Sequence, residues 1–189
     1  MSHLTFVLGG ARSGKSRHAQ ELAEKQGGEG QVVFVATAQA GDDEIAARIA
    51  RHRADRPGHW RTVEEPLDVV GVLGRETEAA AVIIDCLTFF VTNHLLRSGD
   101  AAHCDADVWD EAGTEAAVAG LLVAARGAAP RVILVSNEVG LGLVPETALG
   151  RVWRDVAGRA NQAAAQSADE VTFMVAGLPL RVKPAPGQS

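Results

Sequence analysis

Cysteine and basic charge are both scarce in this sequence. Its two cysteines, Cys86 and Cys104, are too few for a disulfide framework, and neither has neighbours with the spacing of zinc ligands. The 18 lysines and arginines are outnumbered by 24 aspartates and glutamates, which gives a formal net charge of −6. Proteins that hold duplex nucleic acid without sequence preference usually have a basic balance. We therefore expect no nucleic-acid partner.

Long hydrophobic runs are also missing. No apolar stretch reaches the roughly 18 residues that a membrane-spanning helix needs. The first residues lack the basic segment and long apolar run of a secretory signal, since the short apolar run at residues 4–8 is followed by glycine. These two absences predict a cytoplasmic protein without a membrane span.

What the sequence does contain is an ordinary globular composition with alternating strand and helix patterns. Of its 189 residues, 47% are hydrophobic and 22% charged, which is normal for one compact domain. Continuous apolar runs predict strands at residues 4–8, 31–36, 60–63, 81–85, 131–136 and 170–176, with a closing hairpin strand at 180–182. Helical patterns lie at residues 17–26, 42–54, 67–80, 87–97, 107–126 and 145–167.

This alternation predicts the fold class. Short strands without a two-residue alternation are expected where helices cover both faces of a sheet, and repeated strand–helix units give an open, mostly parallel sheet. We predict a single α/β domain over residues 1–183, with an antiparallel hairpin at the C-terminal edge of its sheet. Residues 184–189 are rich in proline and glycine and are expected to form a flexible tail.

A phosphate-binding loop follows the first predicted strand. Residues 9–16 read Gly-Gly-Ala-Arg-Ser-Gly-Lys-Ser and fit G-x-x-x-x-G-K-[ST], in the strand–loop–helix context that the motif requires. Gly9 and Gly14 let the backbone turn tightly, so that its N–H groups and the helix N-terminus converge on phosphate oxygens. Lys15 can reach the β- and γ-phosphates, and the Ser16 hydroxyl can bind Mg²⁺. The loop predicts a P-loop NTPase-type domain that binds a nucleoside triphosphate.

An acidic residue, Asp85, ends the predicted strand at residues 81–85. A carboxylate at the carboxyl end of a neighbouring parallel strand is placed to hold Mg²⁺ or one of its waters, as in the Walker-B arrangement. The alternative is an ordinary aspartate at the end of a strand. Ser16 and Asp85 are therefore the candidate magnesium ligands.

The phosphate loop does not by itself identify the reaction. Motor ATPases, switch GTPases and small-molecule kinases all share it. The Asn-Lys-x-Asp motif with which common switch GTPases read guanine does not occur in the sequence. A small kinase is therefore the default interpretation.

The predicted helix at residues 42–54 carries a candidate nucleophile. Ile45, Ile49 and His52 fall at i, i+4 and i+7, so they share one helix face. Four neighbouring arginines oppose protonation of the His52 imidazole and lower its pKa, whereas the helix C-terminus raises it. A neutral ring could act as a nucleophile, and the arginines could bind a triphosphate. A solvated basic helix end is an equally weighted alternative.

Beyond these features, the sequence resembles one family from its first strand almost to its end. The motifs that carry the resemblance are the phosphate loop, Ala-Thr-Ala at 36–38, His52-Arg53, Arg56-Pro57, Trp60-Arg61-Thr62-Val63-Glu64, Val91-Thr92-Asn93, Ser136-Asn137-Glu138-Val139-Gly140, Ala157-Gly158-Arg159-Ala160-Asn161-Gln162 and Val175-Ala176-Gly177-Leu178-Pro179. Together they are similar to the bifunctional adenosylcobinamide kinase / adenosylcobinamide-phosphate guanylyltransferase family. Where some members have two adjacent histidines, this chain has Arg51-His52.

The resemblance implies two reactions of cobalamin assembly. In the first, ATP or GTP phosphorylates the aminopropanol hydroxyl of adenosylcobinamide. In the second, GTP guanylylates an enzyme histidine, and the GMP passes to adenosylcobinamide phosphate to give adenosylcobinamide-GDP. Substrates and cofactors implied in this way are GTP, ATP, Mg²⁺, adenosylcobinamide and adenosylcobinamide phosphate. The family also implies a homotrimer.

The resemblance also implies which residues form the site. His52 matches the family's guanylylated histidine, so His52 and Lys15 are the candidate catalytic residues. The matching phosphate loop comprises Gly9, Gly10, Ala11, Arg12, Ser13, Gly14, Lys15 and Ser16. Positions matching the family's GTP site are Ala36, Thr37, Ala38, Arg53, Ala54, Asp55, Arg56, Glu64 and Asp85.

Two other functions stay open at this point. One is a monofunctional P-loop kinase that acts on another small alcohol, in which His52 is only structural. The other is a regulatory nucleotide-binding protein whose output is contact with a partner. The sequence leaves open whether ATP or GTP feeds the kinase step and which residue is the kinase base.

Overall fold

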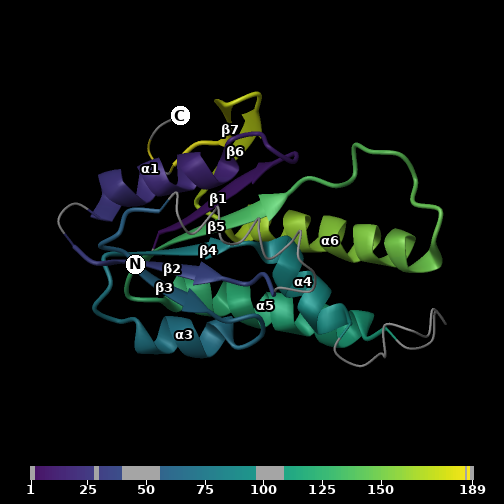
Figure 1. The fold of residues 1–189 in the computed structure, drawn as a ribbon, viewed down its shortest axis with the longest axis horizontal. Helices are drawn as coiled ribbons and strands as arrows, with labels where there is room; N and C mark the ends of the chain where they lie inside the picture. The colour runs from purple at the N-terminus through teal and green to yellow at the C-terminus, as the bar shows by residue number, and fades with distance from the viewer. Residues whose placement is uncertain (1–2, 28–29, 40–55, 97–108, 186, 188–189) are drawn as a thin grey trace.

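A seven-stranded sheet forms the centre of the molecule (Figure 1). The computed structural model describes residues 3–27, 30–39, 56–96, 109–185 and 187. In chain order the strands are β1 (Leu4–Gly9), β2 (Val32–Ala36), β3 (Arg61–Glu64), β4 (Ala81–Asp85), β5 (Arg131–Asn137), β6 (Glu170–Val175) and β7 (Leu178–Lys183). Their order across the sheet is β3-β2-β4-β5-β1-β6-β7. All neighbours pair in parallel except β6 and β7, which pair antiparallel.

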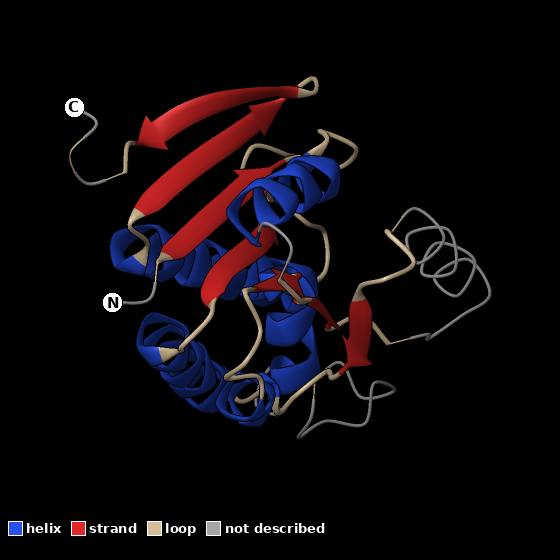
Figure 2. Cartoon of the chain, turned by 90° about the vertical axis from the view of Figure 1, so that its left-hand side faces the viewer, coloured by secondary structure: helices blue, strands red, loops and turns tan. Residues whose placement is uncertain are grey.

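Helices lie on both faces of the twisted sheet (Figure 2). They are α1 (Lys15–Gly27), α3 (Val69–Arg75), α4 (Leu87–Leu95), α5 (Glu111–Gly127) and α6 (Ala148–Ser167). Among the described helices, α1 alone packs on one face, against β4 and β5 near the middle of the sheet, while the other four pack on the opposite face. The predicted fold class is therefore confirmed: a mostly parallel α/β sheet with helices on both faces and an antiparallel hairpin at its C-terminal edge.

Two hydrophobic clusters explain why the strands are continuous apolar runs. One cluster lies between the sheet and helices α3 to α6, and the other lies between the sheet and α1. Successive residues of β4 alternate between them, because Val82 and Ile84 belong to the first cluster and Ile83 to the second. A strand that is buried on both sides therefore carries apolar residues at nearly every position.

Helix boundaries differ from the sequence prediction where a side chain caps the helix later than expected. The helix predicted from Pro145 begins at Ala148, because the Thr147 hydroxyl accepts a hydrogen bond from the Gly150 N–H at 3.1 Å. The helix predicted over residues 67–80 is only α3, since the Asp68 carboxylate caps it and it ends at Arg75. The predicted helix at 42–54 lies outside the described residues.

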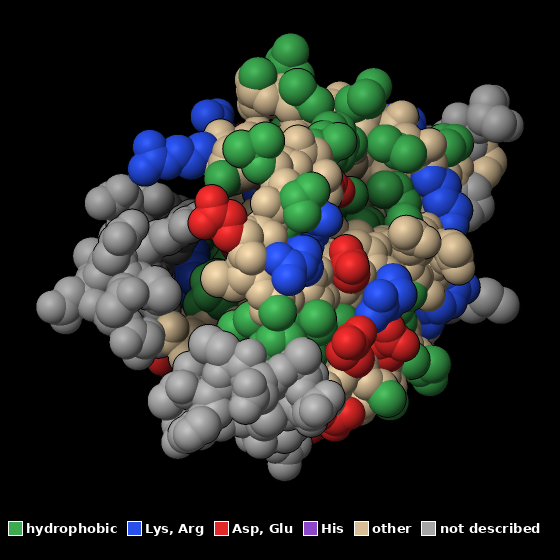
Figure 3. Space-filling view, turned by 90° about the vertical axis from the view of Figure 1, so that its right-hand side faces the viewer, with side chains coloured by type: hydrophobic (Ala, Val, Ile, Leu, Met, Phe, Trp, Pro, Cys, Tyr) green, Lys and Arg blue, Asp and Glu red, His purple; other side chains and the backbone are tan. Residues whose placement is uncertain are grey.

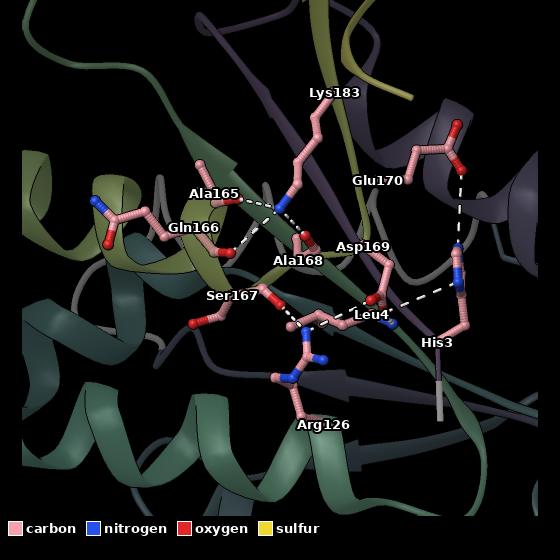
Figure 4. Close-up of polar contacts among 10 residues, drawn as sticks. All are labelled: His3, Leu4, Arg126, Ala165, Gln166, Ser167, Ala168, Asp169, Glu170 and Lys183. Atoms are coloured by element: carbon pink, nitrogen blue, oxygen red, sulfur yellow. Dashed lines mark hydrogen bonds and ion pairs between the residues drawn. The ribbon is translucent and has the colours of Figure 1, made fainter. Parts of the chain in front are cut away.

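Polar contacts tie together the amino ends of β1 and β6 with the C-terminal end of α6 (Figure 4). The Asp169 carboxylate accepts a hydrogen bond from the Leu4 N–H at 2.9 Å. The Lys183 ammonium group, on β7, donates to the carbonyl oxygens of Ala165, Gln166 and Ala168 at the end of α6. A cation there satisfies carbonyls that have no partner within the helix and complements the helix dipole.

The parallel strands all point toward one side of the molecule, which faces the viewer in Figure 3. Ligands of open α/β sheets bind beyond the carboxyl ends of the strands. Hydrophobic, acidic and basic side chains are mixed on this surface, and the exposed apolar residues of the molecule include Leu141, Leu143 and Val144 in the segment that follows β5.

No described helix has both the length and the apolar character needed to cross a membrane.

Candidate nucleotide-binding site

The predicted phosphate loop connects the end of β1 to the start of α1. Gly9 is the last residue of β1 and Lys15 is the first residue of α1, so the motif occupies the strand–loop–helix position that the sequence predicted. The Lys15 side chain is only 7% exposed, and its Nζ donates a hydrogen bond to the Gly10 carbonyl at 2.6 Å. The Lys15 amine therefore lies across the loop, where a bound phosphate chain would meet it.

Two glycines of the loop are required by the close approach of the β6–β7 hairpin. Gly14 has a φ of +94°, and a Cβ atom there would lie 3.3 Å from the Gly177 Cα. A Cβ atom on Gly9 would lie 2.6 Å from the Met174 carbonyl oxygen, which no real contact tolerates. The Gly177 N–H donates to the Ser13 carbonyl at 3.0 Å. The hairpin therefore fixes the loop from behind, a role that the sequence motif alone did not predict.

Ser16 and Asp85 meet directly, as the prediction of a shared magnesium site requires. The Ser16 hydroxyl donates to the Asp85 carboxylate at 2.8 Å. However, the expectation that the strand of Asp85 neighbours the strand of the loop was wrong, because β5 lies between β1 and β4. The contact forms because α1 runs from the end of β1 across β5 and β4 and thereby places its first turn above Asp85.

Those two oxygen atoms fit a magnesium ion held together with a nucleotide. Mg²⁺ prefers oxygen ligands and usually takes only one or two from the protein, with water and phosphate oxygens completing its octahedron. A neutral hydroxyl and a carboxylate within 2.8 Å of each other supply such a pair. The described residues contain no group of three or more His, Cys, Asp or Glu side chains that could hold a metal by themselves.

Two further predicted residues, Ala36 and Glu64, lie on the same face of the sheet as Asp85. Ala36 pairs with Asp85 on one side and with Glu64 on the other, so all three stand at one level across β4, β2 and β3. Two strand spacings separate Asp85 from Glu64, or about 10 Å. Directly paired residues of parallel strands point to the same face. The structure therefore brings the carboxylates of Asp85 and Glu64 and the end of β2 together at the carboxyl edge of the sheet.

Arg56 joins this edge from the segment before β3. Its guanidinium carbon lies 3.6 Å from the centre of the Phe34 ring, and its NH1 donates to the Thr62 hydroxyl at 3.3 Å. Phe34 and Thr62 pair across β2 and β3, two positions before Ala36 and Glu64. The cation–π contact holds the guanidinium in place and thereby sets a positive charge near the edge of the sheet that carries Asp85 and Glu64.

Several predicted residues lie outside the described parts of the chain. They are His52, Arg53, Ala54 and Asp55, together with three of the arginines that the sequence places near His52: Arg48, Arg51 and Arg53. Their roles stay predictions. Of the residues that match the family's GTP site, the structure places Ala36, Thr37, Ala38, Arg56, Glu64 and Asp85.

A group of neutral polar side chains lies behind Asp85, and of these the sequence analysis assigned Thr37 to the GTP site but gave Asn93 and Asn137 no role in it. Thr37 is fully buried, and its hydroxyl both donates to the Cys86 carbonyl and accepts from the Cys86 N–H, each at 2.7 Å. The Asn93 amide donates to the carbonyls of Thr37 and Pro66. The Asn137 amide donates to the Thr88 hydroxyl at 2.8 Å. Their motifs were visible in the sequence, but only the fold shows that they converge.

Burial changes the acid–base chemistry of two side chains near the site. Burial, followed by the charge of Asp85, raises the pKa of the Cys86 thiol to about 11, although a hydrogen bond to Thr88 opposes the shift. Burial also lowers the pKa of His18, in the first turns of α1, against the opposing charges of Glu21 and Glu170. Both shifts favour the neutral form, so neither group adds charge beside the phosphate loop at neutral pH.

Comparison with known proteins gives matches over nearly the whole chain. The family model described as cobinamide kinase / cobinamide phosphate guanyltransferase matches residues 5–182. The bifunctional adenosylcobalamin biosynthesis protein CobP of Pseudomonas aeruginosa is 48% identical over 183 residues, which cover 96% of this chain and 98% of that protein. The corresponding CobU protein of Escherichia coli K12 is 43% identical over 185 residues, covering 95% and 99%.

A solved structure supports the fold independently of close sequence similarity. A KaiC-like protein from the archaeon Pyrococcus horikoshii OT3 matches with a TM-score of 0.53 at 14% identity, covering 90% of this chain and 70% of that one. At this identity the match bears on the fold alone. It agrees with a mostly parallel α/β sheet.

Proposed function

The chain belongs to the cobinamide kinase / cobinamide phosphate guanyltransferase family, and from this premise we propose which of its residues carry out the two reactions. The protein is a bifunctional enzyme of adenosylcobalamin biosynthesis. It phosphorylates adenosylcobinamide and then transfers GMP from GTP to adenosylcobinamide phosphate. The observation that supports our assignment is the direct contact between Ser16 and Asp85 at the start of the helix that Lys15 opens.

In the kinase step, the phosphate loop binds the triphosphate. The loop N–H groups and the N-terminus of α1 hold the phosphate oxygens, and Lys15 contacts the β- and γ-phosphates. Ser16 and Asp85 would hold Mg²⁺, which neutralises charge that develops on the β- and γ-phosphate oxygens. The aminopropanol oxygen of adenosylcobinamide attacks the γ-phosphorus, its proton is released, and the nucleoside diphosphate leaves. The phosphate donor of this step is ATP or GTP, and comparing the initial rates with each identifies it.

In the guanylyltransferase step, we assign the nucleophile to His52. An imidazole nitrogen of His52 attacks the α-phosphorus of GTP and pyrophosphate leaves, which gives a phosphoramidate. A phosphate oxygen of adenosylcobinamide phosphate then attacks the same phosphorus, which restores the histidine and forms adenosylcobinamide-GDP. Arg56, Glu64 and the residues at 36–38 bind the nucleotide in this proposal, together with Arg53, Ala54 and Asp55.

The placement of Arg56 supports the assignment of His52. Arg56 lies over Phe34 on the face of the sheet that carries Asp85. Only four positions of sequence separate it from His52, and four residues span at most about 14 Å of chain. A guanidinium beside the reacting phosphates would stabilise charge on the departing pyrophosphate.

Intact mass measurement tests the covalent step. The protein is incubated with GTP and Mg²⁺, weighed by mass spectrometry, and digested to map any added GMP. We expect one GMP per chain, located on the peptide that contains His52, and no adduct on the His52→Ala variant. That variant should retain most kinase activity, because the phosphate loop is unchanged. A GMP adduct on His52→Ala would contradict the assignment.

The Lys15→Ala variant tests whether one loop serves both reactions. Removing the amine should lower both activities by at least a hundredfold, because each reaction needs the triphosphate held at this loop. Initial rates of phosphate transfer and of GMP transfer are measured on the same preparation. Full kinase turnover in Lys15→Ala would show that the kinase uses another nucleotide site.

The remaining features of the proposal concern the whole protein. We propose that residues 1–183 form one catalytic domain with a flexible tail at 184–189, and that the protein assembles as a homotrimer in the cytoplasm. Light scattering coupled to size-exclusion chromatography gives the mass of the assembly directly. A monomeric mass for the fully active enzyme would rule out the trimer.

A further inference from the structure

We propose that Asn93 is a positioning residue for the magnesium-binding edge of the site and acts on Asp85 through Thr37. The inference rests on the function proposed above and adds a residue from the opposite face of the sheet. Asn93 belongs to α4, which packs with α5 and α6, whereas Ser16 and its helix α1 lie on the other face. Any effect of Asn93 on the Asp85 side chain must therefore be transmitted by the backbone at the carboxyl ends of the strands.

The Asn93 amide joins the ends of two strands. Its Nδ2 donates to the Thr37 carbonyl at 2.8 Å and to the Pro66 carbonyl at 3.0 Å. Thr37 directly follows β2, and Pro66 comes two residues after the end of β3. Both hydrogens of one amide group are thus used on two backbone segments that carry proposed nucleotide-binding residues, those at 36–38 and Glu64.

Thr37 carries this contact onward to the backbone of Asp85. The buried Thr37 hydroxyl holds both the N–H and the carbonyl of Cys86 at 2.7 Å, and the Thr37 N–H donates to the Asp85 carbonyl at 3.1 Å. Three hydrogen bonds from one residue therefore fix the two peptide groups that directly follow the Asp85 side chain. That side chain accepts the hydrogen bond from Ser16.

The chemistry of these contacts determines what their loss would change. Asn93 and Thr37 are uncharged, so replacing them by apolar residues leaves the charge of the site unaltered. What changes is how firmly the Asp85 backbone is held. Outer partners that orient a metal ligand typically contribute about ten- to a hundredfold in metal affinity or activity. The effect should therefore appear in magnesium-dependent nucleotide binding, while binding to the phosphate loop without metal is preserved.

Two variants on adjacent residues of α4 separate positioning from general stability. Asn93→Leu keeps a similar volume but removes both donated hydrogen bonds. Thr92→Val likewise removes two hydrogen bonds: the one that the Trp153 indole donates to the Thr92 hydroxyl at 2.7 Å, and the one that this hydroxyl donates to the Thr88 carbonyl within α4 at 2.8 Å. Both variants should lower the melting temperature. Only Asn93→Leu should alter the site.

The measurement compares the affinity of the full-length protein for a non-hydrolysable GTP analogue in Mg²⁺ and in EDTA, by isothermal titration. In the wild type, Mg²⁺ should tighten binding. In Asn93→Leu the ratio of the affinity in Mg²⁺ to the affinity in EDTA should fall by about tenfold or more, while the affinity in EDTA itself stays unchanged. In Thr92→Val both affinities should match those of the wild type. A wild-type ratio in Asn93→Leu, or an equal loss in Thr92→Val, would overturn the inference.

Thr37 provides a second test if Asn93→Leu does not fold. Thr37→Val removes the hydroxyl with almost no change in shape, and Thr37→Ser retains it. The magnesium-dependent tightening should be lost in Thr37→Val and kept in Thr37→Ser, and equal behaviour of the two overturns the inference. Wild-type protein that lacks both transfer activities would instead refute the proposed function, so the two failures are distinguishable.

Discussion

At the scale of single residues, the glycines of the phosphate loop differ in what a methyl group would meet. Gly14 combines a φ of +94° with a Gly177 Cα 3.3 Å from where its Cβ would stand, whereas a Cβ on Gly10 would have no neighbour within 4 Å. The motif pattern requires the glycine at position 14 but accepts any residue at position 10. The structure supplies the physical reason, which is the hairpin turn behind the loop.

The variant Gly14→Ala tests that reason. A left-handed backbone costs an L-residue about 1–2 kcal/mol, and relief of the contact with Gly177 would shift the loop. We expect nucleotide affinity to fall at least tenfold in a fluorescence titration with a labelled GTP analogue. Gly10→Ala serves as the matched control and should bind as the wild type does. Equal losses in the two variants would show that the hairpin contact is irrelevant.

The buried thiol of Cys86 makes stability depend on alkaline pH. Its pKa is raised from 9.0 to about 11 in the folded protein, so the unfolded chain loses this proton first as pH rises. The contribution of the protonated thiol to the free energy of unfolding is therefore complete below pH 9. It is lost between about pH 9 and 11, at about 1.4 kcal/mol per pH unit. The chain has no tyrosine to titrate in the same range.

Urea unfolding at pH 8 and pH 10 measures this effect in a Cys104→Ser background. The free energy of unfolding should fall by about 1 kcal/mol more with Cys86 present than in a Cys86→Ala variant. Cys86→Ala will be less stable overall, because it loses contacts with Thr88 and Asn137. The decisive quantity is therefore the change in each variant's free energy of unfolding between pH 8 and pH 10. Parallel pH profiles would mean that the thiol keeps its ordinary pKa when folded.

At the scale of helices and strands, the sequence predicted strands well and helix ends poorly. The apolar run at residues 81–85 coincides with β4, because two-sided burial strongly favours apolar residues inside such a strand. Pro145 favours a helix start, but Thr147 is the residue whose side chain caps α6. Proline is only compatible with a first turn, whereas a capping hydroxyl satisfies an otherwise unpaired N–H group.

Lys183 offers a test of how the last strand supports the last helix. Replacing it by methionine keeps the aliphatic stem but leaves the carbonyls at the end of α6 without their cation. We expect a loss of about 1–2 kcal/mol, which lowers the melting temperature by several degrees. Lys25→Met, at an exposed position in the last turn of α1, is the control and should lower the melting temperature by less, because there only a helix-dipole interaction is lost.

At the scale of the whole molecule, strand order was beyond the reach of sequence patterns. Apolar periodicity identifies β4 and β5 as strands but carries no information about which of them lies beside β1. The insertion of β5 between β1 and β4 is set by helix packing and crossover geometry, which involve residues far apart in sequence. Ser16 and Asp85 could be named as candidate magnesium ligands from their motifs, whereas the contacts of Asn93 and Gly177 required the fold.

Nucleotide binding should stabilise the entire domain, because the site joins β1, α1, β4 and the β6–β7 hairpin. A ligand at a hundred times its dissociation constant adds about 2.7 kcal/mol to the stability of the state that binds it. Differential scanning calorimetry with GTP analogue and Mg²⁺ should show a higher melting temperature for the wild type. Lys15→Ala should show no shift, and a shift equal to that of the wild type would place the nucleotide elsewhere.

The position of β1 has a consequence for synthesis on the ribosome. β1 emerges first, yet its two sheet neighbours are β5 and β6, and the turn that holds its glycine loop follows β6. A nascent chain halted before residue 170 has all eight residues of the phosphate motif but neither β6 nor that turn. Such a truncated chain should not retain GTP, so competence to bind nucleotide arises only after β6 and the turn that follows it have been synthesised.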